Sequence, residues 1–173
     1  NTIDGQCTKL TVSTDRTPLV TAPGGTRTVN ASMAYSSYNI TQASSALVGV
    51  NTTKKEQMGV SVVTTGAASP VKVTRLSFLT TGCTSPSTDI QNARLYYTGT
   101  SSTFSTNTPW GFIWTTPTGT FTFTLDQTEN ELANGTNYLW LTYDFKTGAT
   151  IDNFTDAILD ELHVAGTSQT ITT

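Results

Sequence analysis

ELANGTNYLWLTYDF, residues 131–145, places four aromatic side chains directly behind an Asn-Gly turn. Asn134 and Gly135 both tolerate positive φ, which favours a tight turn leading into a strand. The strand alternates two apolar sets, Tyr138 and Trp140 on one face and Leu139, Leu141, Tyr143 and Phe145 on the other. A strand with one face in water would be apolar on one face only. We therefore expect a central strand whose second face is partly covered, and we favour a core role for its aromatic rings over a ligand-binding platform.

The composition favours an all-β protein with a neutral surface. The chain of 173 residues contains 39 Thr and 15 Ser, against only 21 charged residues. Thr is β-branched and suits half-exposed strand faces, whereas long helices prefer Ala, Leu, Glu and Lys. The net charge of −3 gives no basic surface for nucleic acid. No apolar run approaches the roughly 18 residues that a membrane-spanning helix needs, so we expect no membrane span.

Short segments with a period of two recur from Gln57 onward and are separated by Gly, Pro and Asn turns. They lie at residues 57–64, 69–82, 89–99, 118–126, 136–145 and 156–166. In residues 69–82 the apolar positions change from odd to even, which predicts a bulge or bend near Thr74. In residues 156–166 the pattern places Ile158, Leu162 and Val164 on one face, with Asp160 as the exception. Together the pattern predicts an antiparallel β-sandwich, Ig-like or jelly-roll-like, of about 8–9 strands.

The N-terminal part is patterned less clearly. CTKLTVS, residues 7–13, alternates Leu10 and Val12 as a short strand would. TVNASMAY, residues 28–35, could be a second strand with Val29, Ala31 and Met33 on one face. Residues 36–56 are polar, and we interpret them as a loop with one extended piece at 46–50. We accordingly expect an N-terminal arm at 1–44, which could pair with a neighbour, and a sandwich module at 45–173.

The cysteines and sequons point to a secreted or cell-surface protein. Cys7 and Cys83 fit one disulfide in an oxidising compartment, and two free buried thiols are the alternative. The chain opens on Asn1 rather than Met, which suggests a processed mature region. Candidate glycosylation sites are Asn30, Asn39, Asn51, Asn134 and Asn153. Because Thr is so abundant, sequons also arise by chance.

Residues that carry catalysis are sparse, and we expect no enzyme activity, cofactor or metal. The single histidine, His163, has no GxSxG elbow to accompany it, which favours an edge or surface histidine. Asp160 and Glu161 are adjacent on a strand and point to opposite faces. Asp152 and Asp156 belong to a loose acidic series that could hold calcium, but the spacing matches no known calcium loop.

Four aromatic residues beside polar loops are candidates for contact with a carbohydrate: Trp110, Trp114, Tyr35 and Tyr38. Exposed rings stack on sugar faces, and neighbouring Asn, Thr and Asp side chains orient the sugar through hydrogen bonds. The alternative, which we favour, is that Trp110 closes one end of the sandwich and Trp114 belongs to a strand.

VVTTGAASPVKVTRLSFLTTGCTSPSTDIQNARLYYTGTSSTFS (residues 62–105), then Trp110-Gly111, GTFTF and LANGTNYLWLTYDF, resembles the domain on the N-terminal side of BNR-repeat neuraminidases. That module recurs in secreted and surface proteins of Bacteroidetes-type bacteria. The resemblance covers roughly residues 45–166 and implies a non-catalytic accessory or repeat module. Cys83 departs from the family pattern, so a pairing with Cys7 would be particular to this chain.

These observations lead to two expectations for function. The first is a non-catalytic extracellular structural or adhesion module, one unit of a secreted surface protein or fibre, whose partners are other copies or tandem modules. A strand such as residues 7–13 could add to a neighbour's open sheet edge. The alternative is a carbohydrate-binding accessory domain of a glycosidase such as a sialidase, with a glycan as its partner.

Overall fold

The computed structural model describes residues 27–42, 46–125 and 130–172 in full, and only the backbone pairing of six residues before them. It contains two compact units, residues 1–31 and 32–173. In the first unit, β1 (Thr2–Ile3) pairs with β4 (Arg27–Thr28), and β2 (Leu10–Thr11) pairs with β3 (Asp15–Arg16), both antiparallel. Val12, in the expected strand at residues 7–13, lies outside the described residues.

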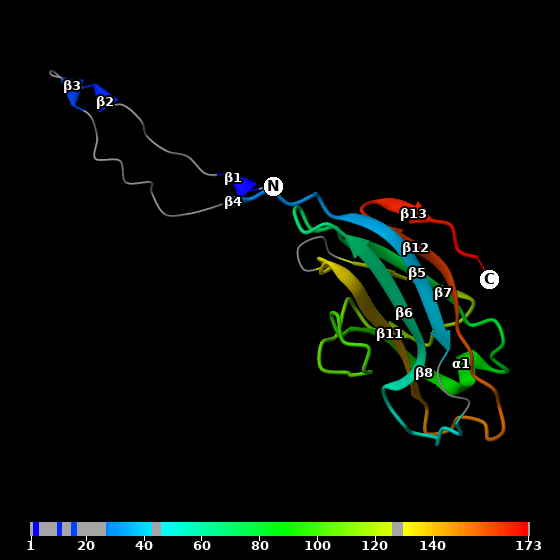
Figure 1. Ribbon diagram of the computed structural model, residues 1–173. Coiled ribbons are helices and arrows are strands. Elements are labelled where there is room, and N and C mark those ends of the chain that lie inside the picture. Colours follow the sequence, from blue (N-terminus) through cyan, green and yellow to red (C-terminus); the bar gives the residue numbers. More distant parts are fainter. Residues whose placement is uncertain are drawn as a thin grey trace. The chain divides into compact units, whose positions relative to one another are not determined.

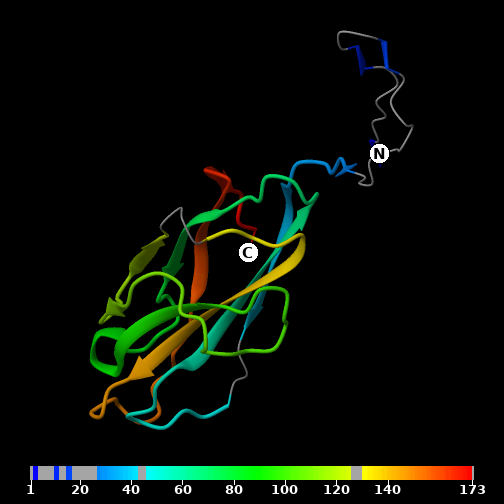
Figure 2. The same cartoon turned by 90° about the vertical axis from the view of Figure 1, so that its left-hand side faces the viewer.

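Two antiparallel sheets, lying face to face, form the second unit (Figures 1 and 2). The strand orders are β5-β6-β11-β8-β9 and β10-β7-β12-β13. The elements are β5 (Ala34–Gln42), β6 (Lys55–Thr65), β7 (Val73–Leu79), α1 (Pro86–Asp89), β8 (Ile90–Tyr97), β9 (Trp114–Thr115), β10 (Thr120–Thr124), β11 (Gly135–Phe145), β12 (Ile158–Val164) and β13 (Thr167–Gln169). The prediction of an antiparallel β-sandwich is confirmed. No helix in the described part of the chain is long and apolar enough to cross a membrane.

β11, which contains the aromatic residues 138–145, is the middle strand of the five-stranded sheet, between β6 and β8. Its inward set, Leu139, Leu141, Tyr143 and Phe145, joins the core between the sheets. The opposing sheet contributes Leu76, Phe78, Phe121, Phe123, Leu159 and Leu162 to the same core. The ring of Tyr143 lies 6.4 Å from that of Phe121, so aromatic contact links the two sheets directly.

Two bulges set which residues face the core. Between β7 and β12 the register passes from His163↔Arg75 to Val164↔Val73, which leaves Thr74 unpaired. The bulge predicted near Thr74 is therefore confirmed. A second shift leaves Asp160 unpaired and reverses the alternation within β12. As a result Leu159 is buried and Ile158 only half-buried, so the expected inward position of Ile158 is wrong.

The interpretation of residues 36–56 as a loop is wrong for their first part. Residues 34–42 form β5, the edge strand of the five-stranded sheet, whereas residues 46–50 form no strand. A register shift between Tyr35 and Ser37 interrupts the alternation, and Tyr35, Tyr38 and Ile40 pack against the core. The pattern was invisible because the bulge breaks the period and the outer face is polar. The sandwich unit accordingly begins near residue 32 rather than 45.

Residues 28–35 also differ from the expected single strand with one apolar face. Val29 is exposed, whereas Met33 is buried. Ser32 makes an isolated parallel bridge to Ala68, and the Met33 sulfur accepts a hydrogen bond from the backbone N–H of Val71. These contacts belong to the start of the sandwich, so Met33 faces its core.

Candidate functional site

The outer face of β11 is covered by the loop that follows β8. Trp140 is only 7% exposed, and its indole N–H donates to Thr98 Oγ1 at 2.8 Å. Phe104 meets the indole edge-on with ring centroids 5.7 Å apart, and Tyr138 lies nearly parallel to it at 6.2 Å. The covered second face is confirmed, and Trp140 belongs to a small cluster outside the core between the sheets.

Gly59 makes room for this cluster. It lies opposite Trp140 in the register of β6 and β11. A Cβ at position 59 would come within 2.8 Å of Trp140 Cζ3, closer than side-chain carbons pack. The absence of a side chain on β6 therefore lets the indole lie flat on the sheet.

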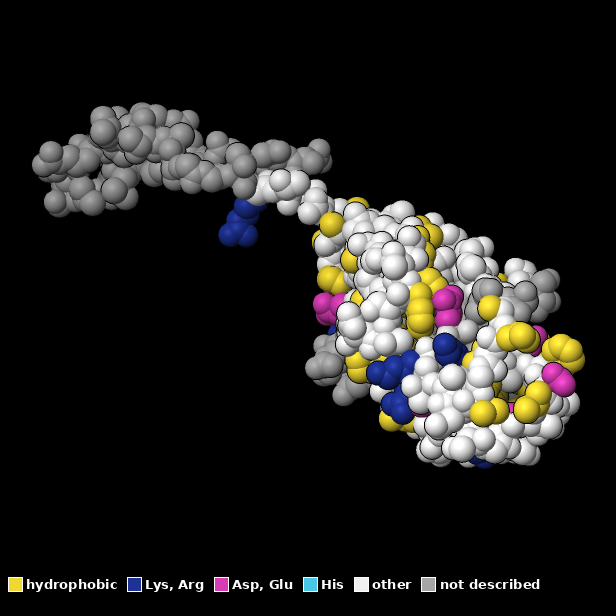
Figure 3. Space-filling model, turned by 90° about the horizontal axis from the view of Figure 1, so that it is seen from below, with side chains coloured by type: hydrophobic (Ala, Val, Ile, Leu, Met, Phe, Trp, Pro, Cys, Tyr) yellow, Lys and Arg dark blue, Asp and Glu magenta, His cyan; other side chains and the backbone are white. Residues whose placement is uncertain are grey.

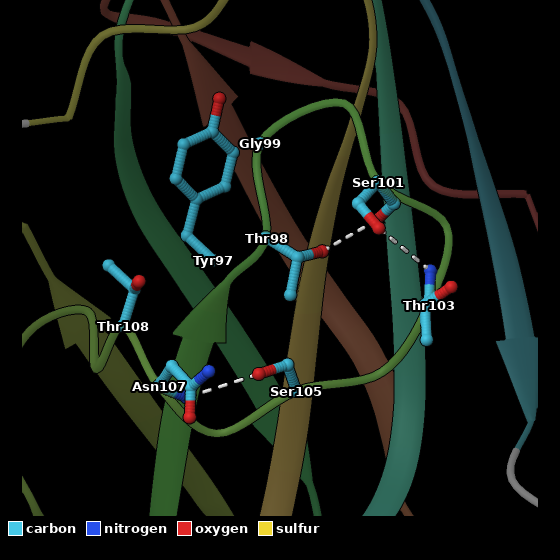
Figure 4. Close-up of a pocket in the computed structure, with 8 residues that line it drawn as sticks. All are labelled: Tyr97, Thr98, Gly99, Ser101, Thr103, Ser105, Asn107 and Thr108. Carbon is cyan, nitrogen blue, oxygen red and sulfur yellow. Dashed lines mark hydrogen bonds between the residues drawn. The ribbon is translucent and has the colours of Figure 1, made fainter.

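The same loop surrounds an open hollow of about 530 Å³ (Figure 4). Tyr97, Thr98, Gly99, Ser101, Thr103, Ser105, Asn107 and Thr108 line it. The loop leaves β8 and returns beside it, because the Tyr97 N–H donates to the Thr108 carbonyl at 3.0 Å. It is also attached to β11, where the Tyr138 N–H donates to the Gly99 carbonyl at 2.9 Å.

Two of the hydroxyl groups that line the hollow form hydrogen bonds within the loop itself. Thr98 Oγ1 donates to the Ser101 carbonyl at 2.7 Å, and Ser105 Oγ accepts from the Asn107 N–H at 3.3 Å. The Tyr97 ring is stacked on Trp110 at 4.5 Å. The hollow thus offers hydroxyl and amide groups that could bind a polyol. Trp110 already covers one face of Tyr97, the aromatic residue among the described residues that line it.

The four aromatic residues expected at a sugar site do not come together. Trp110 is 6% exposed and lies in the core, stacked on Tyr97. Trp114 lies in β9, half-buried, with its indole N–H donating to the Thr122 carbonyl at 2.7 Å. Tyr35 and Tyr38 lie on β5, at the opposite edge of the same sheet. No common platform joins these four described residues.

Asp144, on the same outer face of β11 as Trp140, is a buried carboxylate that was not recognised from the sequence. Asp144 Oδ2 accepts from Asn92 Nδ2 and Arg94 Nε, each at 2.9 Å, and Oδ1 accepts from the Lys54 N–H at 2.8 Å. Burial alone would raise the pKa of Asp144, but these hydrogen bonds and the Arg94 charge outweigh it and lower the pKa. Asp144 thereby fixes the start of β6 to β11.

Asp89 is a second buried carboxylate, and it binds the loop that follows β11. Its Oδ1 accepts from the Thr150 N–H at 2.8 Å and its Oδ2 from Asn153 Nδ2 at 2.7 Å. Burial opposes ionisation, yet these bonds and the charge of Lys146 hold the pKa of Asp89 below its ordinary value. Both carboxylates act as structural acceptors for loops at one end of the sandwich.

Cys83 lies half-buried against the backbone of Asp156. Its thiol donates to the Asp156 carbonyl at 3.2 Å, and its sulfur accepts from the Asp156 N–H at 3.1 Å. Burial raises the pKa of the Cys83 thiol. Cys7 lies outside the described residues, and the part of the chain described contains no disulfide, so the pairing stays a prediction.

The remaining candidates for chemistry form no common site among the described residues. His163 is on β12, an internal strand, with Nε2 3.9 Å from Glu161 Oε2, and Glu161 pairs with Arg75 at 2.8 Å. Asp156 Oδ1 accepts from the Ala157 N–H at 2.7 Å, and Asp152 is exposed with φ of 67°. Among the residues described, no three His, Cys, Asp or Glu side chains converge.

The sequon asparagines differ in exposure. Asn30, Asn39, Asn51 and Asn134 are exposed. Asn153 is half-buried, and its amide nitrogen donates to Asp89. A glycan at Asn153 would therefore compete with a bond that holds the loop.

No protein-family model matches the chain, and no curated protein matches it. The resemblance to the domain beside BNR-repeat neuraminidases therefore stays a prediction.

Proposed function

We propose that this chain is a non-catalytic extracellular structural or adhesion module, and that its sandwich joins a neighbouring copy by strand addition at β5. The open edge of β5 is the observation that carries the proposal. β5 spans nine residues, and among the described strands it pairs with β6 alone. The other terminal strands are shorter: β9 has two residues, β13 three and β10 five. β5 is the longest of these four terminal strands and therefore offers an incoming strand the longest row of backbone groups.

β5 lacks most of the features that protect edge strands from pairing. Natural edges carry charged side chains, prolines, bulges or very short strands. Residues 34–42 contain no charged residue and no proline, and the register shift lies at one end, between Tyr35 and Ser37. From Tyr38↔Val62 to Gln42↔Met58 the pairing with β6 is unbroken. The other edge of that stretch therefore offers its backbone groups in a regular row.

An added strand would also find apolar surface to cover. Tyr38 and Ile40 are half-buried, and the C-terminal segment already contacts this flank, because the Tyr38 hydroxyl accepts from the Thr172 N–H at 2.7 Å. Residues 7–13 of a neighbouring copy would bring Leu10 and Val12 to the rest of this flank. The neutral surface, rich in Thr and Ser, also supports an extracellular scaffold.

The proposal is tested by the oligomeric state of the full chain, measured by light scattering and electron microscopy over a concentration series. In chain produced without N-glycosylation, since Asn39 and Thr41 also form a candidate sequon, we expect concentration-dependent assembly. Asn39→Lys/Thr41→Lys should abolish it, because lysines disfavour edge pairing. Gln91→Lys/Thr100→Lys adds the same charge at exposed positions away from β5 and should leave assembly intact. Deletion of residues 1–14 should also prevent assembly. A chain that stays monomeric at every concentration contradicts the proposal.

A second candidate is a carbohydrate-binding accessory domain, and the hollow beside Thr98–Thr108 is the observation that favours it. Its hydroxyl and amide groups could hydrogen-bond a sugar. Binding to immobilised glycans that Asn107→Ala/Thr108→Ala removes, with the melting temperature unchanged, would support this function over the first.

A further inference from the structure

Two loops lie side by side at the lower end of the sandwich in Figure 1, and we call residues 46–54 and 146–155 the loop end. The Asn51 N–H donates to the Lys146 carbonyl at 3.2 Å, and the Phe145 N–H donates to the Thr52 carbonyl at 2.8 Å. Thr147 Oγ1 and Asn51 Oδ1 are 3.3 Å apart. The loops thus form one surface.

The loop end exposes large apolar side chains. Leu47 is fully exposed, and Ile151 and Phe154 are 78% and 75% exposed. Val48 and Val50 are also exposed on the first loop. Figure 3 faces this end of the molecule and shows hydrophobic side chains on the surface, with both basic and acidic side chains near them. Single exposed apolar residues are ordinary, but five on two touching loops indicate an interaction surface.

The first loop also carries positive charge. Lys54 and Lys55 are exposed and line an open hollow of about 310 Å³ together with Leu47, Val48 and Phe104. Glu56 lines the same hollow, which therefore contains two lysines and one acidic residue among its described lining. On the second loop, Lys146 Nζ donates to the Ser87 carbonyl at 2.6 Å. Asp152 is exposed beside Ile151 on the second loop, so the excess of positive charge belongs to the first loop, where cationic and aliphatic groups line the same hollow.

The exposure of these side chains is held in place by the buried carboxylates. Asp144 binds the N–H of Lys54 at the end of the first loop. Asp89 binds the Thr150 N–H and the Asn153 amide within the second loop, on either side of Ile151. Both loops are therefore tied to the buried carboxylates at these points.

We infer that the loop end is a binding surface for a lipid bilayer that contains acidic headgroups. Side chains on loop tips can enter the interface between headgroups and acyl chains, and lysines behind them attract acidic lipids. A protein partner would have to match the shape of both loops, whereas a bilayer adapts to it. In this proposal a lipid phosphate lies in the hollow lined by Lys54 and Lys55, with its acyl chain along Leu47 and Val48.

Co-sedimentation of the full chain with vesicles tests the inference. We expect binding to phosphatidylcholine mixed with phosphatidylglycerol, and weaker binding to phosphatidylcholine alone. Leu47→Ser/Phe154→Ser should lower binding to the mixed vesicles about tenfold or more, because both side chains lose their apolar burial. Lys54→Gln/Lys55→Gln should cost about fivefold per lysine with acidic vesicles only. Ile113→Ser, a change of a 47% exposed residue beside β9, is the matched control and should change nothing.

A direct contact measurement accompanies these variants. In Leu47→Trp, the new indole should be quenched by brominated lipid, whereas the fluorescence of the parent chain should not change. The inference is overturned if neither vesicle binds the chain, or if Leu47→Ser/Phe154→Ser binds as well as the parent. It is also overturned if these variants alter only the oligomeric state without lipid, since the loop end would then be a protein contact. Assembly at β5 is read in the absence of lipid, so the two proposals fail independently.

Discussion

The contact between Gly59 and Trp140 tests whether the indole is a packed structural element or a ligand platform. In Gly59→Ala the new Cβ would lie 2.8 Å from Cζ3 and 3.1 Å from Cε3 of the indole. Thr98, Phe104 and Tyr138 hold the ring from its other sides, so the strain cannot be relieved by a small rotation. Overpacking typically costs about 1–3 kcal/mol, and the lost flexibility of the unfolded chain returns about 0.4–1 kcal/mol.

We therefore expect Gly59→Ala to lower the free energy of unfolding by about 1–2 kcal/mol, or the melting temperature by roughly 2–8 °C. In a Trp140→Leu background, which lacks the ring atoms, the same change should become neutral or stabilising by about 0.4–1 kcal/mol. Gly148→Ala is the control, because a Cβ there meets no atom within 4 Å. Urea denaturation followed by circular dichroism gives all four corners of the cycle.

Two results would refute this reasoning. Equal costs of Gly59→Ala in both backgrounds would show that the indole is not fixed against β6. Trp140→Ala should cost about 3–5 kcal/mol. If it instead kept the melting temperature of the parent and lost a ligand, Trp140 would be a platform.

Three further predictions concern charge and chemistry. Asp144→Asn should lower the free energy of unfolding by about 1.5–3 kcal/mol near pH 7. Because folding lowers the pKa of Asp144, its contribution to stability is complete above the unfolded pKa near 3.9 and is lost as pH falls through the lower folded pKa. The free energies of unfolding of variant and parent, measured from pH 7 to pH 2, should therefore converge. Cys7 and Cys83 should form a disulfide that closes a loop of about 76 residues and contributes roughly 4 kcal/mol, so thiol titration of the denatured, unreduced chain should detect none. The chain should hydrolyse neither sialosides nor common glycosides, and turnover lost in His163→Gln would contradict this.

The strands could be predicted where a single face is apolar and the period is unbroken. β6, β8 and β10 satisfy that condition, whereas β11 was recognised because two apolar sets alternate behind an Asn-Gly turn. Even the bulge at Thr74 left a change of parity in the sequence. The bulge at Asp160 was not recognised, because Ile158 and Leu159 are adjacent and apolar and either could face inward. β5 was missed because its outer positions are Ser, Asn and Thr, which a polar loop also contains.

The buried carboxylates could not be predicted, since their partners are distant in sequence. Asp144 and Arg94 are 50 residues apart, and Asp89 and Asn153 are 64 apart. The sequence contained one signal for Asp144. It shares the outer face of β11 with Trp140, and this face was expected to be partly covered. A carboxylate on a covered face needs donors nearby. The sequence alone could not name them, because only the pairing of β11 with β8 brings Asn92 and Arg94 alongside.

The positions of the buried carboxylates and the lack of charged residues on β5 link the fold to both proposed surfaces, the β5 edge and the loop end. The chain has few charged residues, and two of its carboxylates are buried where loops must be fastened. The β5 edge carries none, which leaves its backbone open to another strand. The loops fastened by Asp89 and Asp144 carry the exposed apolar tips. Asp144 also holds the start of β6, the neighbour of β5, whereas Asp89 binds the second loop. Asp89→Asn should consequently weaken vesicle binding more than assembly, and an equal loss of both would contradict this division.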